Sequence, residues 1–368
     1  MQTQSATRLA TIAQARHAIL RQGERVGGAI EPWIASSWLR CLQRGHNPRD
    51  RVGFDPIGAA AMRRTAEASH ALRRAAAPVL ADLLQVIAPT RYFSILTDAQ
   101  GIVIDVGGNA DFSVPPVRAI ARIGLDLSER SVGTTAIGAA LAELHSVWLH
   151  RGEHFFEATS VYSCAGAPIF GPDGGCAGML DLTGVQAEER PELRHLAAQM
   201  AERVEQALLL AVPHALLLHL QWPGPASAAG AGLLAVDGEG RIVGANRSAC
   251  AMLGLRHGAG QAGFGGLEAA FATPSGQLMG LRPGAAPRQV PLWSGLHVLV
   301  VAASCGGAGR IDLPPPAQAR PVAKLRDTEA ALIHAAVEAA RGNVAAAARQ
   351  LGISRATVYR HLKAGQRR

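Results

Sequence analysis

Several features of secreted, membrane-bound and disulfide-rich proteins are missing from this chain of 368 residues. It has five cysteines, unevenly spaced and without a C-x-x-C pair, which disfavours a disulfide framework and a zinc motif. The N-terminus has no basic-then-apolar signal pattern, and no uninterrupted apolar run is long enough to span a bilayer. We therefore expect a cytoplasmic protein with reduced thiols and no contact with a membrane.

Motifs of common catalytic sites are missing too. The chain contains neither the G-x-x-x-x-G-K-[ST] loop that cradles nucleotide phosphates nor the G-x-S-x-G turn of serine hydrolases. Four candidate metal ligands lie close in sequence without matching the spacing of a metal motif, and these are His145, His150, His154 and Cys164. We expect no enzymatic activity, no metal and no cofactor. Oxidation of Cys164 or Cys176 stays open, because thiol reactivity depends on local pKa and exposure.

The most specific pattern in the chain is a helix-turn-helix over residues 343–363. An alanine-rich segment predicts a helix up to Gln350, Gly352 can adopt the left-handed conformation that ends it, and Ser354 can cap the next helix. The second helix then presents donors suited to phosphates and base edges. The candidate DNA-binding residues are Asn343, Ser354, Arg355, Thr357, Arg360, His361 and Lys363.

The positive charge of the chain is concentrated in the same region. Residues 318–368 hold ten Lys or Arg and three Asp or Glu, a net +7 of the +8 carried by the whole chain. A domain that neutralises a phosphate backbone has this kind of charge. A solvated basic tail is the alternative, but the helix-turn-helix spacing favours double-stranded DNA as the partner.

The first half of the chain predicts a helical region followed by an antiparallel α+β domain. Residues 1–85 are predicted to be helical, with one helix starting at Pro32 and another stretch over 56–86. Apolar runs at 92–97 and 102–106 flank turn residues and predict a β-hairpin. The further predicted elements are a helix at 131–144 and strands at 147–150, 161–170 and 176–183.

A long helix and a second α+β segment follow. Residues 187–212 predict a helix with an apolar repeat in steps of four and three, as in a coiled coil. The repeat consists of Leu193, Ala197, Met200, Val204, Ala207 and Ala211. A helix packed on its own domain is the alternative, and we favour a dimeric connecting helix because a sensor needs a route to its output. Strands within 232–302 form the second segment, and residues 303–321 are rich in Gly and Pro, as in a flexible tether.

Short motifs along the chain occur in an order and spacing typical of one group of proteins. They are SWLRC at 37–41, SVGTTAIG at 131–138, GEHF at 152–155, SCAGAPI at 163–169 and GMLDLTG at 178–184. With these motifs the chain resembles the acetoin-catabolism type of bacterial regulator, in the broader group with a Fis-type C-terminal helix-turn-helix. The first motif is similar to the family's opening motif, the other four resemble its GAF sensor domain, and residues 231–255 resemble the start of a PAS domain.

The resemblance implies a multidomain α+β protein with a GAF-like antiparallel-sheet sensor, a PAS-like α+β segment and an all-α C-terminal helix-turn-helix. The expected parts are an N-terminal helical region at 1–85, the GAF-like domain at 86–186, a connecting helix and possible dimer seam at 187–222, the PAS-like domain at 223–305, the tether at 306–321 and the Fis-type DNA-binding domain at 322–368.

The GAF-like domain is expected to bind a small organic metabolite, because pockets of this kind combine apolar walls with a few placed polar groups. The candidate ligand-binding residues are Thr134, Thr135, His154, Phe155, Tyr162 and Cys164. For each of them taken singly, a role as a satisfied interior residue is the alternative.

One departure from the family bears on mechanism. Full-length members carry an ATPase module that remodels RNA polymerase bound to sigma-54, and this chain has a Pro-rich tether and no phosphate loop in that place. We therefore expect a homodimeric, ligand-responsive DNA-binding regulator that acts without ATP hydrolysis, either by contacting or blocking RNA polymerase directly or by tuning other regulators. The alternatives are an interaction protein whose C-terminal hairpin docks on a protein partner, and an enzyme built on the GAF-like scaffold.

Overall fold

The computed structural model describes residues 2–22, 28, 30–224, 231–255, 264–305 and 344, with side chains described from residue 7 onward. The proposed tether and nearly all of the helix-turn-helix therefore lie outside the described residues. The same holds for every candidate DNA-binding residue, namely Asn343, Ser354, Arg355, Thr357, Arg360, His361 and Lys363. These assignments stay predictions.

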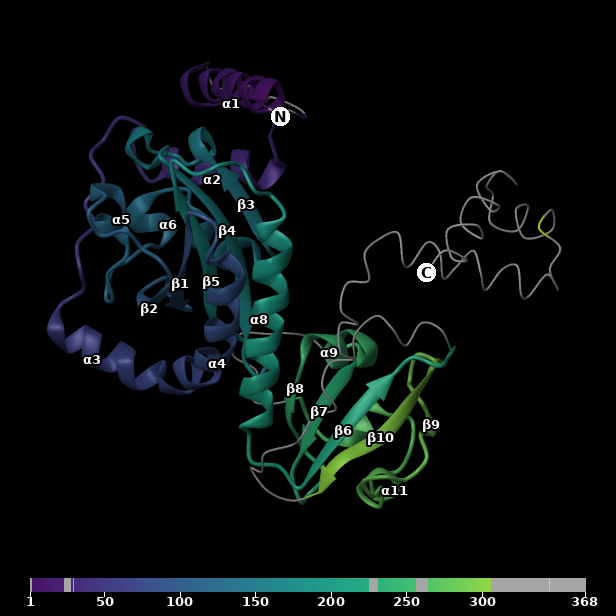
Figure 1. Ribbon diagram of the computed structural model, residues 1–368. Helices are drawn as coiled ribbons and strands as arrows, with labels where there is room; N and C mark the ends of the chain where they lie inside the picture. The colour runs from purple at the N-terminus through teal and green to yellow at the C-terminus, as the bar shows by residue number, and fades with distance from the viewer. Residues whose placement is uncertain are drawn as a thin grey trace. The chain divides into compact units, whose positions relative to one another are not determined.

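Four helices precede the first sheet (Figure 1). They are α1 (Gln2–Gln22), α2 (Pro32–Gln43), α3 (Ala59–Ala68) and α4 (His70–Ile87). Pro32 stands at the start of α2, as predicted, because its fixed φ suits the first turn of a helix and its missing N–H is not needed there. The stretch predicted to be helical over 56–86 consists of two helices, α3 and α4, and the break between them falls at Ser69.

The first sheet has five antiparallel strands in the order β2-β1-β5-β4-β3. Their bounds are β1 (Tyr92–Asp98), β2 (Val103–Gly107), β3 (Val147–His150), β4 (Tyr162–Phe170) and β5 (Cys176–Val185). The predicted hairpin is confirmed: Asp98 accepts hydrogen bonds from the backbone N–H groups of Gln100 at 2.9 Å and Ile102 at 2.8 Å, and Gly101 takes the positive φ that the turn requires.

Both faces of this sheet are buried. Along β1, Phe93 and Ile95 point into one core cluster while Tyr92 and Leu96 point into the other, as the two-residue period of a strand dictates. The first cluster includes side chains of α2 and α7 (Ala136–Glu143), and the second includes side chains of α4 and α8 (Leu193–Leu210). Helices α1, α2 and α4 thus contribute side chains to the core of the first sheet, and residues 1–85 are not a separate region.

The helix predicted over 131–144 is two short helices, α6 (Glu129–Val132) and α7, which corrects the sequence interpretation. Gly133 has φ 67°, and a Cβ at this position would lie 2.8 Å from the Phe156 ring, so the chain turns sharply where only glycine fits. Thr135 then caps α7 by accepting a hydrogen bond from the Gly138 N–H at 3.1 Å. The other short elements of the domain are α5 (Pro115–Ile120), η1 (Arg151–Glu153) and η2 (Glu157–Thr159).

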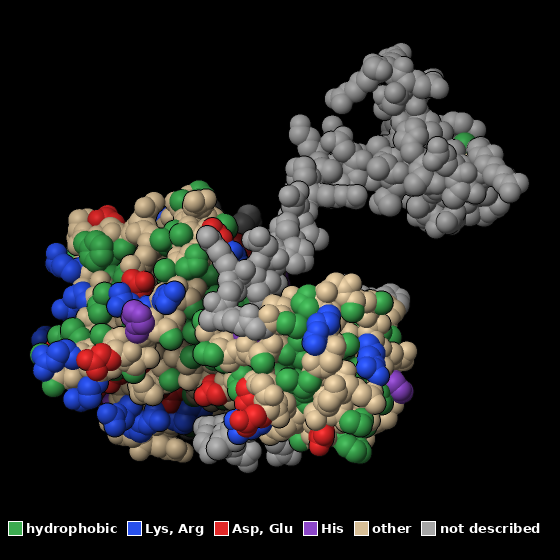
Figure 2. Space-filling model, turned by 90° about the horizontal axis from the view of Figure 1, so that it is seen from below, with side chains coloured by type: hydrophobic (Ala, Val, Ile, Leu, Met, Phe, Trp, Pro, Cys, Tyr) green, Lys and Arg blue, Asp and Glu red, His purple; other side chains and the backbone are tan. Residues whose placement is uncertain are grey.

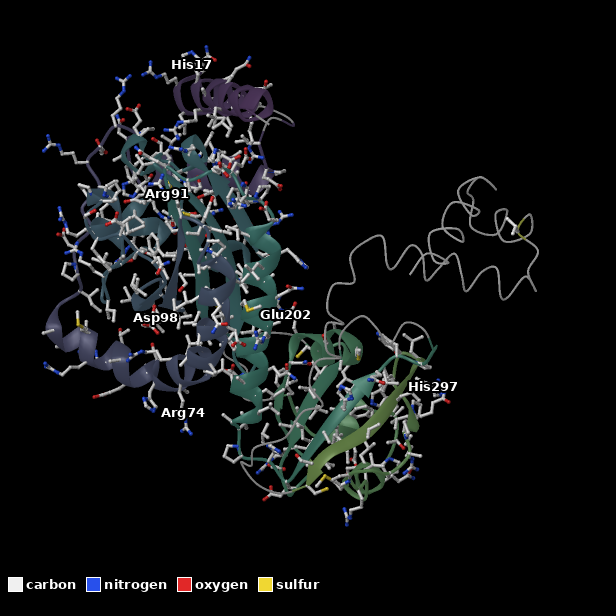
Figure 3. All side chains as sticks on the ribbon, in the orientation of Figure 1. His17, Arg74, Arg91, Asp98, Glu202 and His297 are labelled. Atoms are coloured by element: carbon white, nitrogen blue, oxygen red, sulfur yellow. The ribbon has the colours of Figure 1, made fainter. Side chains whose placement is uncertain are left out.

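Helix α8 packs on its own domain, which corrects the expected dimer seam. Leu193, Ala197 and Val204, three members of the predicted repeat, are buried in the second core cluster against α4 and the sheet. A face that fills the core of its own domain cannot also pack against a second chain. The opposite face of α8 is exposed at Glu202 (Figure 3) and at Arg203, which pairs with Asp82 of α4 at 2.6 Å.

The second sheet is also antiparallel and has the order β8-β7-β6-β10-β9. Its elements are β6 (Leu216–Gln221), β7 (Gly232–Val236), β8 (Ile242–Ala245), α9 (Arg247–Leu253), α10 (Leu267–Ala270), α11 (Ser275–Met279), β9 (Arg288–Pro291) and β10 (His297–Cys305). The central strand β6 lies before the predicted boundary at 223. The boundary was wrong because Leu216, Leu218 and Leu220 alternate into the core of this sheet rather than extending the preceding helix.

No helix among the described residues is both long and apolar enough to cross a bilayer. The surface near α3 and α4 is rich in arginine (Figure 2). Four exposed arginines lie on these two helices, namely Arg63, Arg64, Arg73 and Arg74.

Trp38 on α2 should contribute strongly to stability. Its side chain is fully buried, and its Nε1–H donates to the carbonyl oxygen of Glu153 at 2.9 Å. We expect Trp38→Ala to lower the free energy of unfolding by about 3–5 kcal/mol through lost burial and a cavity, measured by chemical denaturation. The neighbouring Leu39→Ala is the control, because Leu39 is 44% exposed and should change stability by less than about 1 kcal/mol. Equal losses in the two variants would contradict the packing described here.

Candidate ligand-binding site

A small cavity lies against the first sheet, on the face covered by α5, α6 and α7. The volume that the centre of a water molecule can occupy is about 30 Å³, which is room for roughly one or two waters. Its apolar lining consists of Phe54, Ile95, Ile120, Leu127, Val132, Ala136 and Ile137. Its other lining residues are Thr135, His154, Thr159, Tyr162, Cys164, Asp181 and Thr183. A bound organic molecule would therefore be small and would need some side chains to move.

Four of the six candidate ligand-binding residues line this cavity. They are Thr135, His154, Tyr162 and Cys164. The sequence analysis missed Asp181 and Thr183, although both belong to the GMLDLTG motif. The signal was available in the strand period: Asp181 and Thr183 lie two residues apart on β5, and Thr183 is the cross-strand neighbour of Cys164 on β4. Residues on one face of neighbouring strands share one environment.

Thr134 does not line the cavity, and its hydroxyl is used elsewhere. It lies 2.7 Å from the Ser37 hydroxyl and 3.6 Å from Cys41 Sγ, both on α2. Ser37 in turn donates to the buried carboxylate of Glu129 at 2.6 Å. Burial alone would raise the pKa of Glu129, but its hydrogen bonds from Arg40, Ser37 and Arg44 hold that pKa below its ordinary value. Thr134 therefore belongs to a polar network that ties α2 to α6.

Phe155 is likewise part of the core rather than of the cavity wall. It is fully buried and packs edge-to-face on Phe156, with ring centroids 5.0 Å apart. Its backbone N–H donates to the Thr134 carbonyl at 3.3 Å. For Thr134 and Phe155, the structure supports the interior role that the sequence analysis left as the alternative.

His154, which lines the cavity, has an unused hydrogen-bond acceptor. Its Nδ1 lies 3.0 Å from the Arg151 carbonyl, which can only accept, so we assign the ring proton to Nδ1. Nε2 then carries a lone pair, is fully buried and has no partner among the described residues. Burial lowers the pKa of His154 to about 4, so the ring is neutral at physiological pH.

Asp181 supplies the second buried polar atom without a partner. One of its oxygens, Oδ2, accepts a hydrogen bond from the Thr183 hydroxyl, which itself lies 3.3 Å from Cys164 Sγ. The other, Oδ1, has no partner among the described residues. Burial raises the pKa of Asp181 to about 7, so the carboxyl keeps its proton about half of the time near neutral pH. Leaving two such atoms bare costs stability, which a hydrogen-bonding ligand would offset.

The thiols of Cys164 and Cys176 are poorly suited to redox chemistry. Burial raises the pKa of Cys164 well above its ordinary value, and the charge of Asp181 acts in the same direction. Burial also raises the pKa of the half-buried Cys176, whose Sγ lies 3.4 Å from the Gly178 carbonyl. Both groups are thiols rather than the reactive thiolates at neutral pH. Within the described ranges, no group of three or more His, Cys, Asp or Glu could hold a metal ion.

Two protein families match parts of the chain. Residues 10–206 match the family described as MimR, N-terminal domain. Residues 324–365 match the family described as bacterial regulatory protein, Fis family.

Several curated relatives with similar sequences are transcriptional regulators. The acetoin catabolism regulatory protein of Cupriavidus necator is 31% identical over 60% of this chain and 34% of its own length. The acetoin dehydrogenase operon transcriptional activator AcoR of Bacillus subtilis is 29% identical over 48% of this chain and 29% of its own length. The propane 2-monooxygenase operon transcriptional activator MimR of Mycolicibacterium goodii is 29% identical over 53% and 33%. The chain thus spans about a third of the length of these relatives.

Among solved structures, the complex of DhaR(N) with DhaL from E. coli is similar to 74% of this chain and 99% of the matched chain. The TM-score is 0.46 and the sequence identity 14%.

The buried carboxyl of Asp181 should leave a signature in the pH dependence of stability. Its pKa is about 7 in the folded chain, against about 3.9 in an unfolded one, so between pH 4 and 7 the folded state holds a proton that the unfolded state has lost. Its contribution is complete below pH 4 and falls by about 1 kcal/mol per pH unit up to pH 7. The pKa values of His150 and His154, lowered to about 4, act in the opposite direction between pH 4 and 6.5.

The contribution of Asp181 is therefore isolated by comparing Asp181→Asn with the wild type in urea unfolding at pH 4.5, 5.5 and 6.5. We expect the variant to gain stability relative to the wild type as the pH rises. Asp55→Asn, at an exposed position, should show a constant difference. A constant difference for Asp181→Asn as well would show that this carboxyl ionises normally.

Proposed function

Because the chain belongs to the family of the MimR N-terminal domain, we propose that it is a ligand-responsive transcription regulator. In this proposal the first-sheet domain binds a small neutral metabolite, and residues 324–365 bind double-stranded DNA as a Fis-type helix-turn-helix. The observation that carries the proposal is the combination of this DNA-binding family at the basic end of the chain with unpartnered polar atoms on two residues that line the cavity.

The charge of the C-terminal region supports DNA binding. A net +7 over residues 318–368 would neutralise phosphates, and this term supplies much of the affinity of DNA-binding proteins. We assign base contacts to Arg355, Thr357, Arg360 and His361, since arginine can bond guanine O6 and N7 at once. Asn343, Ser354 and Lys363 would contact the phosphate backbone. Function in the cytoplasm follows from DNA binding in a bacterial regulator.

The chemistry of the cavity defines the class of ligand. His154 Nε2 can only accept a hydrogen bond and so calls for a hydroxyl or amine donor. The protonated form of Asp181 can donate to a carbonyl oxygen, and the ionised form can accept from a second hydroxyl. A free carboxylate would place a negative charge among buried acceptors and is disfavoured. We therefore propose a neutral alcohol, diol or hydroxyketone of a few non-hydrogen atoms.

The names of the relatives agree with this class. Two of them are named for acetoin catabolism or the acetoin dehydrogenase operon, and acetoin carries a hydroxyl next to a carbonyl. Thr135, Tyr162 and Cys164 would form the rest of the wall around such a molecule.

The proposed output is a homodimer on two half-sites about one helical turn apart, whose spacing responds to the ligand. The buried face of α8 does not supply the dimer contact, so that contact must involve another surface. The sequence between the two matched families contains no phosphate loop, and we propose direct contact with RNA polymerase without ATP hydrolysis.

Removing the free acceptor of the cavity should abolish ligand recognition. We expect His154→Phe, which keeps a flat ring but lacks Nε2, to weaken binding of acetoin or 2,3-butanediol at least tenfold in isothermal titration calorimetry. Thr159→Val is the matched control. Thr159 lines the same cavity, but its hydroxyl already donates to the Phe156 carbonyl at 2.9 Å, so affinity should change less than about twofold. Acetate, which is smaller but carries a negative charge, should not bind. If the two variants bind alike, recognition does not use His154.

Specific DNA binding is tested at the predicted recognition helix. We expect Arg355→Ala and Arg360→Ala each to cost roughly 1–3 kcal/mol of binding to an operator selected from genomic fragments, measured by gel shift at fixed salt. Gln366→Ala changes a residue beyond the predicted helix and should alter affinity little. Unchanged affinity in both arginine variants would refute the recognition helix. Steep salt dependence without any preferred sequence would instead support the alternative of a hairpin that binds a protein partner.

A further inference from the structure

A second, larger cleft lies between α1 and the turn that follows α2. Its volume, measured in the same way as that of the cavity, is about 730 Å³. This volume is within the range of binding sites for small organic molecules. Helix α1 contributes Arg16, His17 and Arg21, and Figure 3 marks His17 on this helix. No residue lines both the cleft and the cavity.

The cleft carries an excess of positive charge. Three arginines line it, Arg16, Arg21 and Arg49, together with the imidazoles of His17 and His46. Its one acidic residue is Glu157, which pairs with Arg49 at 3.6 Å with both side chains more than 60% exposed. A pair this long and this exposed is weak and leaves Arg49 able to bind another anion. Arg21 has no hydrogen-bond or ion-pair partner among the described residues.

Arg16 is the second and independent indication of an anion site. Its guanidinium is partly buried over the ring of Trp38, with 5.5 Å between Cζ and the ring centroid. It donates to the carbonyl oxygens of Gly152 and Phe155, each at 2.8 Å, and to that of His154, but no described carboxylate lies within ion-pair distance. Burial lowers the pKa of Arg16, with Glu157 acting weakly in the other direction. A partly buried charge without a counterion is costly, and an anion in the cleft would supply it.

We propose that this cleft binds a small multivalent anion, a phosphate or a polycarboxylate, as a second effector separate from the neutral ligand of the cavity. Arg21 and Arg49 hold the anion from the two sides of the cleft, and Arg16 faces it from the wall. The carbonyls that Arg16 holds belong to the loop that also places His154 in the cavity. The anion, through Arg16, and the cavity ligand, through His154, therefore act on the same loop, and any coupling between them is reciprocal.

The test is calorimetric titration of the full chain with sodium phosphate and, separately, sodium citrate, with sodium chloride holding ionic strength constant. Wild-type protein should show saturable binding of at least one of them. Arg21→Gln combined with Arg49→Gln should weaken that binding at least tenfold. Arg63→Gln combined with Arg64→Gln removes two exposed arginines of α3 that do not line the cleft, and should leave binding within twofold.

The outcomes distinguish a phosphorylated compound from a polycarboxylate. They also distinguish failure of the anion site from failure of the cavity site. Binding of phosphate alone assigns a phosphorylated compound, and binding of citrate alone assigns a polycarboxylate. Absence of saturable binding, or equal weakening by both double variants, overturns the site. Thermal unfolding without anion checks that the exposed Arg21 and Arg49 can be replaced without loss of fold. Because the cleft and the cavity share no lining residue, the His154→Phe variant should still bind the anion. Anion binding can therefore be observed whether or not the cavity binds a neutral ligand.

Discussion

The buried carboxylate of Glu129 is the interaction on which the first-sheet domain depends. Both of its oxygens are bonded by Arg40, each at 2.8 Å, and Arg44 and Ser37 add two further bonds. This set of bonds satisfies a charge that would otherwise be expensive to bury. It also connects α2 to α6. The backbone nitrogen of Glu129 would lie only 2.6 Å from a Cβ at position 138, which explains a glycine in the first turn of α7. Val132 of α6 and Ala136 and Ile137 of α7 line the cavity, so the connection between α2 and α6 helps to position the cavity wall.

Burial then sets the ionisation of the groups inside the cavity. The same loss of water lowers the pKa of His154 and raises that of Asp181, because in each case it disfavours the charged form. The result is a largely apolar cavity lined by a neutral imidazole and by a carboxyl that is protonated about half of the time near neutral pH. The cleft outside it is lined by three arginines, whose guanidinium groups are always protonated in proteins, and the two sites favour ligands of opposite character.

Much of the organisation was readable from local patterns. The start of α2 at Pro32, the turn from Asp98 to Gly101 and the strands β3, β4 and β5 depend on residues close in sequence, and they were predicted correctly. The break at Gly133 was missed because the residue that forbids a continuous helix there, Phe156, is distant in sequence. Asp181 was missed because its place in the cavity follows from strand pairing with β4.

The sequence by itself determined the start of α2, the hairpin of β1 and β2, the positions of β3, β4 and β5 and the concentration of positive charge at the C-terminal end. Tertiary structure decided that Thr135 faces the cavity while Thr134 joins a network with α2, and that the apolar face of α8 serves its own core. Local propensity and charge are properties of neighbouring residues, and so a sequence displays them. Burial, pKa and the direction of a side chain arise from contacts between distant segments, and only the folded chain sets them.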